Sequence, residues 1–437
     1  MSDYTTLLQQ SPDPETAAIR LDQLLQDVTA RRYLAKMPSG SMPTFIHLIS
    51  ISNFLFRYFC RHPGVIVSLY GPNAMERDKF DGISDSSTLR TFKYQELLKI
   101  TWMDLAEKFS YPVILDRLSH LADNVIIKAM HLAAADKQYP GCEHSKIPFC
   151  IFAMGKLGAN ELNYSSDIDL IFVARNYSEF NSGALDYLGG VIDHVRRFNA
   201  LMQEVSEDGF LYRVDLKLRP WGRSGPLVIS IDETEHYYEA STEAWERFAW
   251  LRARILSGGD RKLGEDLLGR LEPFIYLRSL GSDDLERFIR IKNDMARQRR
   301  RNENWNVKMG EGGIRDIEFF IQILQIVNAH THPVLKSTNT LMVLENLVKL
   351  GFVSREDGSD INDSYLFLRR LENRLQMVDE QQTHLLPDDI RLRRKIACSL
   401  GFGGSSDEQT VERFDRQLEK HRQVAKSCFK RILPKES

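Results

Sequence analysis

Two short apolar runs near the middle of the chain predict neighbouring buried strands. The runs are Ile151–Met154 and Leu170–Val173, and turn residues bound both of them. Between them lies Gly155–Gly158 (GKLG), which we interpret as a flexible turn carrying one cation. Asp167 and Asp169 enter the second run one residue apart. Because side chains alternate along a strand, we expect both carboxylates to project from one face at the mouth of a sheet.

A further alternating segment supplies a third carboxylate. In Phe210–Leu218, the charged residues Arg213, Asp215 and Lys217 alternate with apolar neighbours, which predicts a strand with one buried and one charged face. A turn then leads to another strand, Leu227–Ser230. The pattern therefore predicts Asp215 on a strand beside the one that carries the Asp167 and Asp169 pair.

Apolar residues at helical spacing cover most of the remaining chain. The glycine-rich turn at 310–313 is expected to open a helix, and Phe45–Val67 is expected to be a core helix. Polar residues and Pro63 interrupt that last segment, so it does not predict a membrane span. The other expected helices are Tyr94–Leu105, Ile114–Val125, Ala184–Glu207, Trp245–Arg254, Asp283–Asn302 and a bundle from Thr340 onward, with Tyr365, Leu368, Leu371 and Leu375 on one core stripe.

These patterns predict an α+β fold that is mostly helical and contains a small mixed sheet. Pro140 and Gly141 interrupt the chain just before the first strand and indicate a domain boundary. We expect an N-terminal helical region at 1–140, a catalytic core at 141–260 and a C-terminal helical domain at 261–437.

Composition narrows the class of protein. The 437 residues are 43% hydrophobic and 27% charged, with a formal net charge of −2, which argues against a general nucleic-acid coat. The five cysteines form no CxxC pair, so we expect reduced thiols and neither a disulfide framework nor a zinc finger. The N-terminus lacks the pattern of a signal peptide, and we expect a cytoplasmic protein without a membrane partner.

Three carboxylates on two neighbouring strands suit metal-dependent nucleotidyl transfer. Mg²⁺ takes oxygen ligands and keeps positions open for substrate phosphates. Two such ions roughly 3.5–4 Å apart can clamp the entering and leaving oxygens of a displacement at phosphorus. Asp167, Asp169 and Asp215 fit this need, and backbone N–H groups of the Gly155 turn could face phosphate, with Lys156 adding a charge.

Each motif also has a structural alternative. A lone DxD often caps a helix, and Asp215 between two cations could belong to a charged strand face. Arg252 and Arg254 could hold phosphate or pair with Glu243 and Glu246. The joint occurrence of the glycine turn, the strand DxD and the third strand aspartate favours the catalytic interpretation.

Two further groups of charged residues remain open in the same way. Residues 312–318, which include Arg315, Asp316 and Glu318, could line the cleft or be structural. The basic cluster Arg297–Arg301 could contact nucleic acid, but a solvated helix end is the favoured interpretation.

Five long segments resemble the glutamine synthetase adenylyltransferase/deadenylylase family. They are FAMGKLGANELNYSSDIDLIFVA, LYRVDLKLRPWGRSGPLVIS, EAWERFAWLRARIL, GEGGIRDIEFFIQILQ and LFLRRLENRLQMVDEQQTHLLP. The resemblance runs from the DxD core almost to the C-terminus, whereas the first 140 residues or so agree only in helical character. It implies a DNA polymerase beta-like nucleotidyltransferase core flanked by helical domains.

The resemblance also implies the reaction and its participants. Family members usually have two related halves, and RPWGRSGPL together with the 366–387 segment resembles the N-terminal half, which removes AMP from a tyrosine of glutamine synthetase by phosphorolysis. The chain is thus expected to be this deadenylylase domain, either alone or as part of a longer enzyme. The metal-binding carboxylates would be Asp167, Asp169 and Asp215, the cofactor Mg²⁺, and the further partner the PII signal protein. The expected phosphate- and nucleotide-binding residues are Gly155, Lys156, Ser166, Arg213, Lys217 and Arg219.

Two other functions remain open at this point. The same chemistry run forward would adenylylate glutamine synthetase with ATP. A module without catalysis could instead sense nucleotide or PII, although the three aspartates speak against it.

Overall fold

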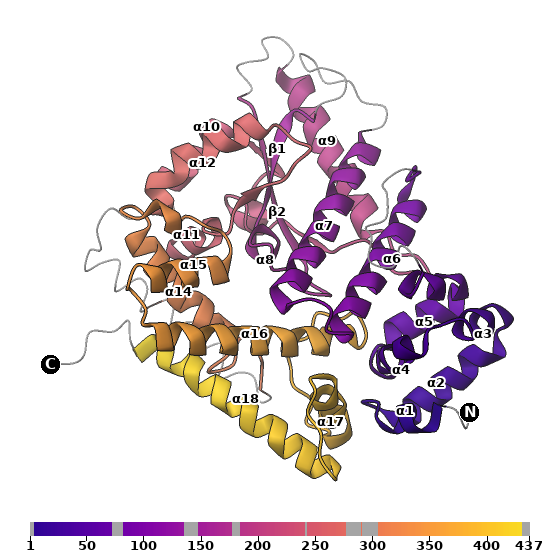
Figure 1. The fold of residues 1–437 in the computed structure, drawn as a ribbon. Coiled ribbons are helices and arrows are strands. Elements are labelled where there is room, and N and C mark those ends of the chain that lie inside the picture. The colour runs from indigo at the N-terminus through magenta and orange to yellow at the C-terminus, as the bar shows by residue number, and fades with distance from the viewer. Residues whose placement is uncertain are drawn as a thin grey trace.

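Helices dominate the molecule and enclose a small mixed sheet (Figure 1). The computed structural model describes residues 4–71, 82–134, 147–176, 184–240, 243–276, 290 and 305–430. The mostly helical α+β class predicted from the sequence is confirmed.

The sheet is built on a central antiparallel pair. Strand β1 (Phe149–Ala153) pairs with β2 (Ile168–Ala174), and β5 (Arg254–Ile255) pairs with the other side of β1. Two short strands run parallel to β2: β3 (Val214–Asp215) pairs with its start and β4 (Val228–Ser230) with its end. The structure therefore confirms three predicted strands: the central pair at Ile151–Met154 and Leu170–Val173, and the strand at Leu227–Ser230.

Both faces of the sheet are buried, which explains why its central strands are continuous apolar runs. Alternate residues of β1 and β2 enter two different hydrophobic cores. Helices α6 (Ser86–Leu105), α7 (Tyr111–Ala133) and α9 (Ala184–Gln203) contribute to the first core. Helices α10 (Ile231–Ala240) and α12 (Arg261–Ile275) contribute to the second, and Figure 1 shows them on the side of the sheet opposite α7 and α9.

The N-terminal region is helical, as predicted, but its apolar segment 45–67 is not one helix. Ser52 accepts a hydrogen bond from the backbone N–H of Leu55, which starts a new helix, and Pro63 starts a 3-10 turn. The elements here are α1 (Thr5–Gln9), α2 (Pro14–Gln26), α3 (Val28–Leu34), η2 (Ser39–Ser41), α4 (Met42–Ile51), α5 (Asn53–Arg61) and η3 (Pro63–Leu69).

The C-terminal region is the predicted helical bundle, with a third core of its own. Its predicted stripe from Tyr365 to Leu375 is buried. The elements are α14 (Ile314–Asn328), η6 (Pro333–Leu335), α15 (Thr340–Lys349), α16 (Arg355–Met377), α17 (Ile390–Ser399) and α18 (Asp407–Lys430). The expectation that a glycine-rich turn opens a helix at 314 is confirmed.

Three further local predictions were wrong. The segment 210–218 is a strand only at Val214–Asp215, because the N–H of Tyr212 donates to the carbonyl of Met202 outside the sheet. Helix α11 (Ala244–Trp250) ends before Arg254, which lies on β5. The segment Gly155–Gly158 is not a flexible turn but a single helical turn, α8.

Some predictions fall outside the described residues. These are the boundary at Pro140 and Gly141, the basic cluster Arg297–Arg301 and nearly all of the helix at 283–302. The four described cysteines, Cys60, Cys150, Cys398 and Cys428, are free thiols. None of the helices in the described part of the chain is long and apolar enough to cross a bilayer.

Candidate active site

The three predicted aspartates come together at the start of β2. Asp167 directly precedes this strand, Asp169 lies within it, and the parallel register of β2 with β3 sets Asp169 opposite Asp215. All three side chains line one cavity of about 570 Å³. The expected same-face pair and its neighbour on an adjacent strand are thus present, while their catalytic role remains a prediction.

This active-site cavity is lined by several separate parts of the chain. They are helix α8, the start of β2, the end of β3, helix α11, the start of α14 and the loops that carry Lys308 and Gln382. The lining residues are Gly155, Lys156, Ser166, Asp167, Asp169, Asp215, Leu218, Trp245, Phe248, Ala249, Arg252, Lys308, Met309, Arg315, Glu318, Phe319, Gln322 and Gln382.

Asp169 lies in an environment that disfavours its charge. Burial, followed by repulsion from the Asp215 carboxylate, raises the pKa of Asp169 to about 7, while Lys308 opposes the shift. A bound cation would remove this repulsion, and carboxylate oxygens are the ligands that Mg²⁺ prefers. The donor set therefore fits a divalent metal ion.

Two of the three carboxylates have partners from the chain itself. Arg213 donates its Nε to Asp167 Oδ1 at 2.6 Å. Asp215 accepts hydrogen bonds from Lys217, at 2.8 Å from the backbone N–H and also from Nζ. Within the described ranges, no three His, Cys, Asp or Glu side chains are arranged to hold a metal ion. Binding an ion would require these two carboxylates to exchange a basic side chain for the metal.

Helix α8 lies directly against Asp169. Gly155 has a φ of +57°, and a Cβ placed there would lie 2.8 Å from Asp169 Oδ2. A Cβ on Gly158 would lie 1.7 Å from the carbonyl oxygen of Arg252. The two glycines of GKLG therefore let the backbone approach both the carboxylate and the segment after α11.

Lys156 is bound to a carboxylate from the C-terminal bundle. Its Nζ donates to both Glu372 oxygens, at 2.8 and 2.7 Å, and the Glu372 side chain is fully buried. Burial lowers the pKa of Lys156 to about 7, and Glu372 opposes that shift. Lys156 does line the cavity, but its charge is largely matched before any phosphate arrives.

Two cations that the sequence analysis did not assign to phosphate also line the cavity. Lys308 lies in the loop before α14, and Arg315 lies in the first turn of that helix. Among the described residues the Lys308 ammonium pairs with no carboxylate, in contrast to Lys156. Arg315 makes only a 3.8 Å contact with Glu318 and is 45% exposed. These two side chains are therefore available to an anion.

The loop that carries Lys308 has a fixed backbone. Asn306 Oδ1 accepts hydrogen bonds from the N–H groups of Lys308 and Met309, at 3.0 and 2.7 Å. Gly312 has a φ of +75°, and a Cβ on Gly313 would meet three carbonyl oxygens within 2.9 Å. The glycines of the GEGG turn were the one sequence signal that pointed here, and the expectation that 312–318 could line the cleft is confirmed for Arg315 and Glu318.

Neither Arg252 nor Arg254 pairs with the glutamates considered from the sequence. Arg252 lines the cavity and donates to Glu318 at 3.1 Å. Arg254 makes two hydrogen bonds to Asp123 on α7, at 2.9 and 3.0 Å. Their partners lie 66 and 131 residues away, which local spacing cannot reveal.

The other predicted phosphate-binding residues are placed differently from one another. Ser166 lines the cavity, whereas Lys217 is bound to Asp215 and half-exposed. Arg219 donates to the carbonyls of Leu216 and Gly225 and so braces its own turn. The structure does not bring Arg219 to the cavity lining.

Two family models match the chain, one after the other. The model of glutamate-ammonia ligase adenylyltransferase matches residues 73–270, and the model of GlnD PII-uridylyltransferase matches residues 287–433. The first match contains the three aspartates, and the second contains Lys308, Arg315 and Glu372. Residues of both matched regions therefore line the same cavity.

Proposed function

Because the chain belongs to the glutamate-ammonia ligase (glutamine synthetase) adenylyltransferase family, we propose that it removes AMP from an adenylylated tyrosine of glutamine synthetase by phosphorolysis. The observation that carries this proposal is the cavity in which Asp169 lies opposite Asp215, and which Asp167, Lys308 and Arg315 also line. Carboxylates for a metal and cations for phosphate oxygens are what a phosphoryl-centred displacement needs.

The proposed reaction exchanges one phosphorus–oxygen bond for another. An oxygen of inorganic phosphate forms a bond to the α-phosphorus of the tyrosyl-AMP ester, and the bond from this phosphorus to the phenolic oxygen breaks. The products are ADP and tyrosinate, which takes a proton from water. With an unperturbed pKa of about 10, the phenol is a tolerable leaving group.

The chain's own residues divide this work. Lys308 and Arg315 would bind and orient the attacking phosphate, and Lys156, together with Ser166, would lie close to the AMP phosphate. Asp167, Asp169 and Asp215 would hold Mg²⁺, which when bound would offset charge on the phosphoryl oxygens. Phosphate is already anionic at neutral pH, so no base is needed to activate it.

The proposed direction of the reaction, deadenylylation, is supported by the resemblance of two sequence motifs. RPWGRSGPL, from Arg219 to Leu227, and the 366–387 segment resemble the deadenylylating half of the family. The name of the second matched family refers to PII, which supports the PII signal protein as a regulatory partner. Adenylylation with ATP would use the same cavity in reverse and is the alternative to be tested beside it.

A pair of radiolabelling reactions tests the function. Labelled phosphate with adenylylated glutamine synthetase should yield labelled ADP, and labelled ATP with the unmodified enzyme should leave glutamine synthetase unlabelled. Labelled glutamine synthetase in the second reaction would instead establish adenylylation. Tight nucleotide binding without product in either reaction would identify a sensing module.

The Asp169→Asn variant gives the matching control. It should lose phosphorolysis while its circular dichroism spectrum stays unchanged. Full turnover by a well-folded Asp169→Asn protein would refute the metal-dependent mechanism.

A further inference from the structure

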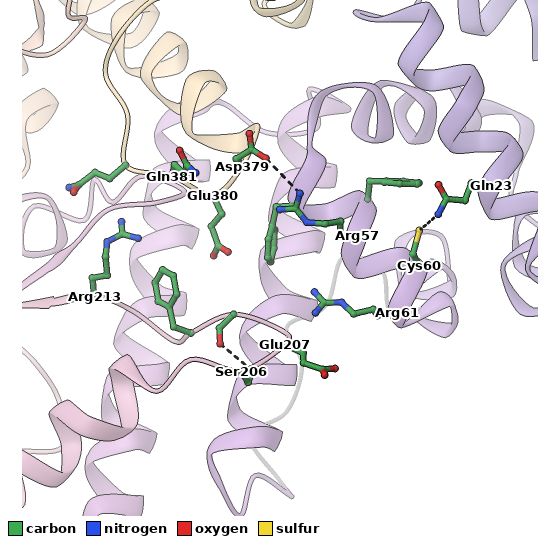
Figure 2. A pocket seen from close by; sticks show the side chains of 15 residues that line it. Gln23, Arg57, Cys60, Arg61, Ser206, Glu207, Arg213, Asp379, Glu380 and Gln381 are labelled. Atoms are coloured by element: carbon green, nitrogen blue, oxygen red, sulfur yellow. Dashed lines mark hydrogen bonds and ion pairs between the residues drawn. The ribbon is translucent and has the colours of Figure 1, made fainter.

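A second and larger cavity lies beside the active-site cavity. This lateral cavity, of about 890 Å³, is lined by residues of α2 and α5, by the loop 206–213 after α9 and by the loop 379–382 after α16 (Figure 2). The proposed function assigns no role to it.

The two cavities adjoin each other. Gln382 lines both of them. Arg213 lines the lateral cavity, and its Nε donates to Asp167 of the active-site cavity at 2.6 Å. A single side chain therefore separates the lateral cavity from one of the three carboxylates.

The lateral cavity has the composition of a protein-binding surface. Phe54, Phe56 and Phe210 supply its apolar part, and they are buried or half-buried. Some of the charged groups around them are more exposed: Arg57 is 58% exposed and lies 3.9 Å from Asp379, whereas Glu380 is 10% exposed. An apolar centre with a polar rim is typical of interfaces, in which aromatic residues and arginine are enriched.

A buried lysine holds two walls of the lateral cavity in place. Lys93 Nζ donates to the carbonyl of Phe210 at 3.2 Å and to Glu380 Oε1 at 2.7 Å, and its side chain is 2% exposed. It thus ties the loop after α9 to the loop after α16. Because these walls are fixed before any partner arrives, little ordering entropy would be lost when one binds.

We propose that the lateral cavity binds the polypeptide segment that flanks the modified tyrosine of the protein substrate. This inference rests on the proposed function, because it takes the tyrosyl-AMP ester to lie at the three aspartates. An extended chain advances about 3.3–3.6 Å per residue, so residues adjacent to that tyrosine reach the neighbouring cavity at once. The segment would place an apolar side chain against the phenylalanines and its polar backbone beside Gln381 and Gln382.

The open shape favours a polypeptide over a small molecule. Small-ligand sites typically bury 70–90% or more of their ligand. Here Arg57 remains 58% exposed and Cys60 is exposed, so one side of the cavity faces solvent. A protein segment can enter from that side while the rest of its protein stays outside.

A substitution at Cys60 tests the inference. Its thiol is exposed, lines the lateral cavity and makes only a 3.8 Å contact with Gln23, so Cys60→Trp should fill the cavity without disturbing the core. Two substrates are compared: adenylylated glutamine synthetase, and the 4-nitrophenyl ester of AMP, which has no polypeptide. The KM for the protein substrate should rise roughly tenfold, whereas kcat/KM for the ester should change by less than about twofold. Ile19→Trp, at a 63% exposed position of α2 outside the cavity, is the matched control and should change neither.

The outcomes separate the two proposals. An equal loss with both substrates would assign the cavity to a ligand acting on the catalytic centre and would overturn the docking inference, as would no change with either. If the unsubstituted chain turns over neither substrate, the proposed function fails. Binding of adenylylated glutamine synthetase to immobilised Cys60→Trp protein, measured without turnover, still decides docking, since an unchanged Kd would refute it.

Discussion

At the scale of single residues, the active-site cavity is lined by two kinds of charged side chain: those that already have a partner of opposite charge and those that do not. Asp169 is buried beside another carboxylate, and Lys308 pairs with none among the described residues. Lys156, Arg252 and Glu318, by contrast, already have partners of opposite charge. Unmatched charges are the ones that a ligand can satisfy, so substitutions at Asp169 and Lys308 should separate function from stability.

Replacing Asp169 should stabilise the protein while abolishing its activity. Its pKa of about 7 lies above the unfolded value of about 3.9, so the folded state binds the proton more tightly. The resulting destabilisation of the folded state is absent below about pH 4. It grows as the pH rises from about 4 to about 7 and is complete above pH 7. In chelator at pH 8, Asp169→Asn should therefore be more stable by on the order of 4 kcal/mol.

Thermal melts of both proteins in chelator at pH 5.5 and pH 8 measure this effect. The gain in Tm should be larger at pH 8. A gain that grows toward acid pH would contradict the assignment of the raised pKa to burial and to Asp215.

Removing the Lys308 charge should weaken phosphate binding. Lys308→Met keeps most of the side-chain volume, and we expect the KM for phosphate to rise by roughly tenfold or more, because a charge-assisted contact typically contributes about 1.5–3 kcal/mol. Initial rates at varied phosphate measure it. Lys349→Met, which removes a lysine from an exposed pair on α15, should leave that KM unchanged. An unchanged KM in Lys308→Met would exclude Lys308 from phosphate binding.

At the scale of elements, the one-turn helix α8 joins the sheet to the C-terminal bundle. Its Lys156 pairs with Glu372 of α16, which also contacts Arg369 and His384. GKLG was expected to be a flexible turn because glycine usually indicates backbone flexibility. Here each glycine serves close packing against a segment remote in sequence, and that use cannot be recognised without the neighbour.

Breaking this contact between elements should destabilise the fold. Glu372→Gln leaves Lys156 buried without a matching charge, although Arg369 keeps its pair with Glu161, so the free energy of unfolding should fall by about 3 kcal/mol. Urea unfolding measures it. Glu345→Gln, which breaks an exposed pair with Lys349, should change it by less than about 1 kcal/mol. Similar losses in both variants would mean that the buried Lys156–Glu372 pair contributes no more to the free energy of unfolding than the exposed pair does.

At the scale of the whole molecule, the site is shared between distant parts of the chain. The α14 residues Phe319, Ile323 and Ile326 belong to the same core as one face of the sheet, and Phe319 stacks on Phe248 at 4.8 Å between ring centroids. Met377 of α16 belongs to the core on the other face. The C-terminal helices therefore contribute side chains to both of the hydrophobic cores that the sheet enters.

A chain that ends at residue 276 should consequently fold poorly. It would expose both cores where α14 and Met377 normally cover them, and we expect a broad thermal transition and binding of the dye ANS, unlike the full chain. It would also lack Lys308 and Arg315. A cooperative melt without dye binding would show that the sheet and its N-terminal helices are stable alone.

The same sharing explains what the sequence could and could not predict. Asp167, Asp169 and Asp215 could be predicted from the sequence because strand alternation is a local pattern and the family motifs are long. The extent of the strand around Asp215 was overestimated, because Tyr212 gives its N–H to Met202 rather than to a neighbouring strand. Lys308 and the partners of Arg252 and Arg254 were missed because contacts across more than 60 residues leave no local pattern.

The ion pairs on Asp167 and Asp215 should weaken metal binding by the protein alone. An incoming divalent ion must compete with a guanidinium and an ammonium that are already tethered to the chain. Phosphate groups of a substrate can draw these basic side chains toward themselves, and the freed carboxylates then become stronger ligands. Ion and nucleotide should therefore strengthen each other's binding reciprocally, so that the metal is retained chiefly when there is an ester to act on.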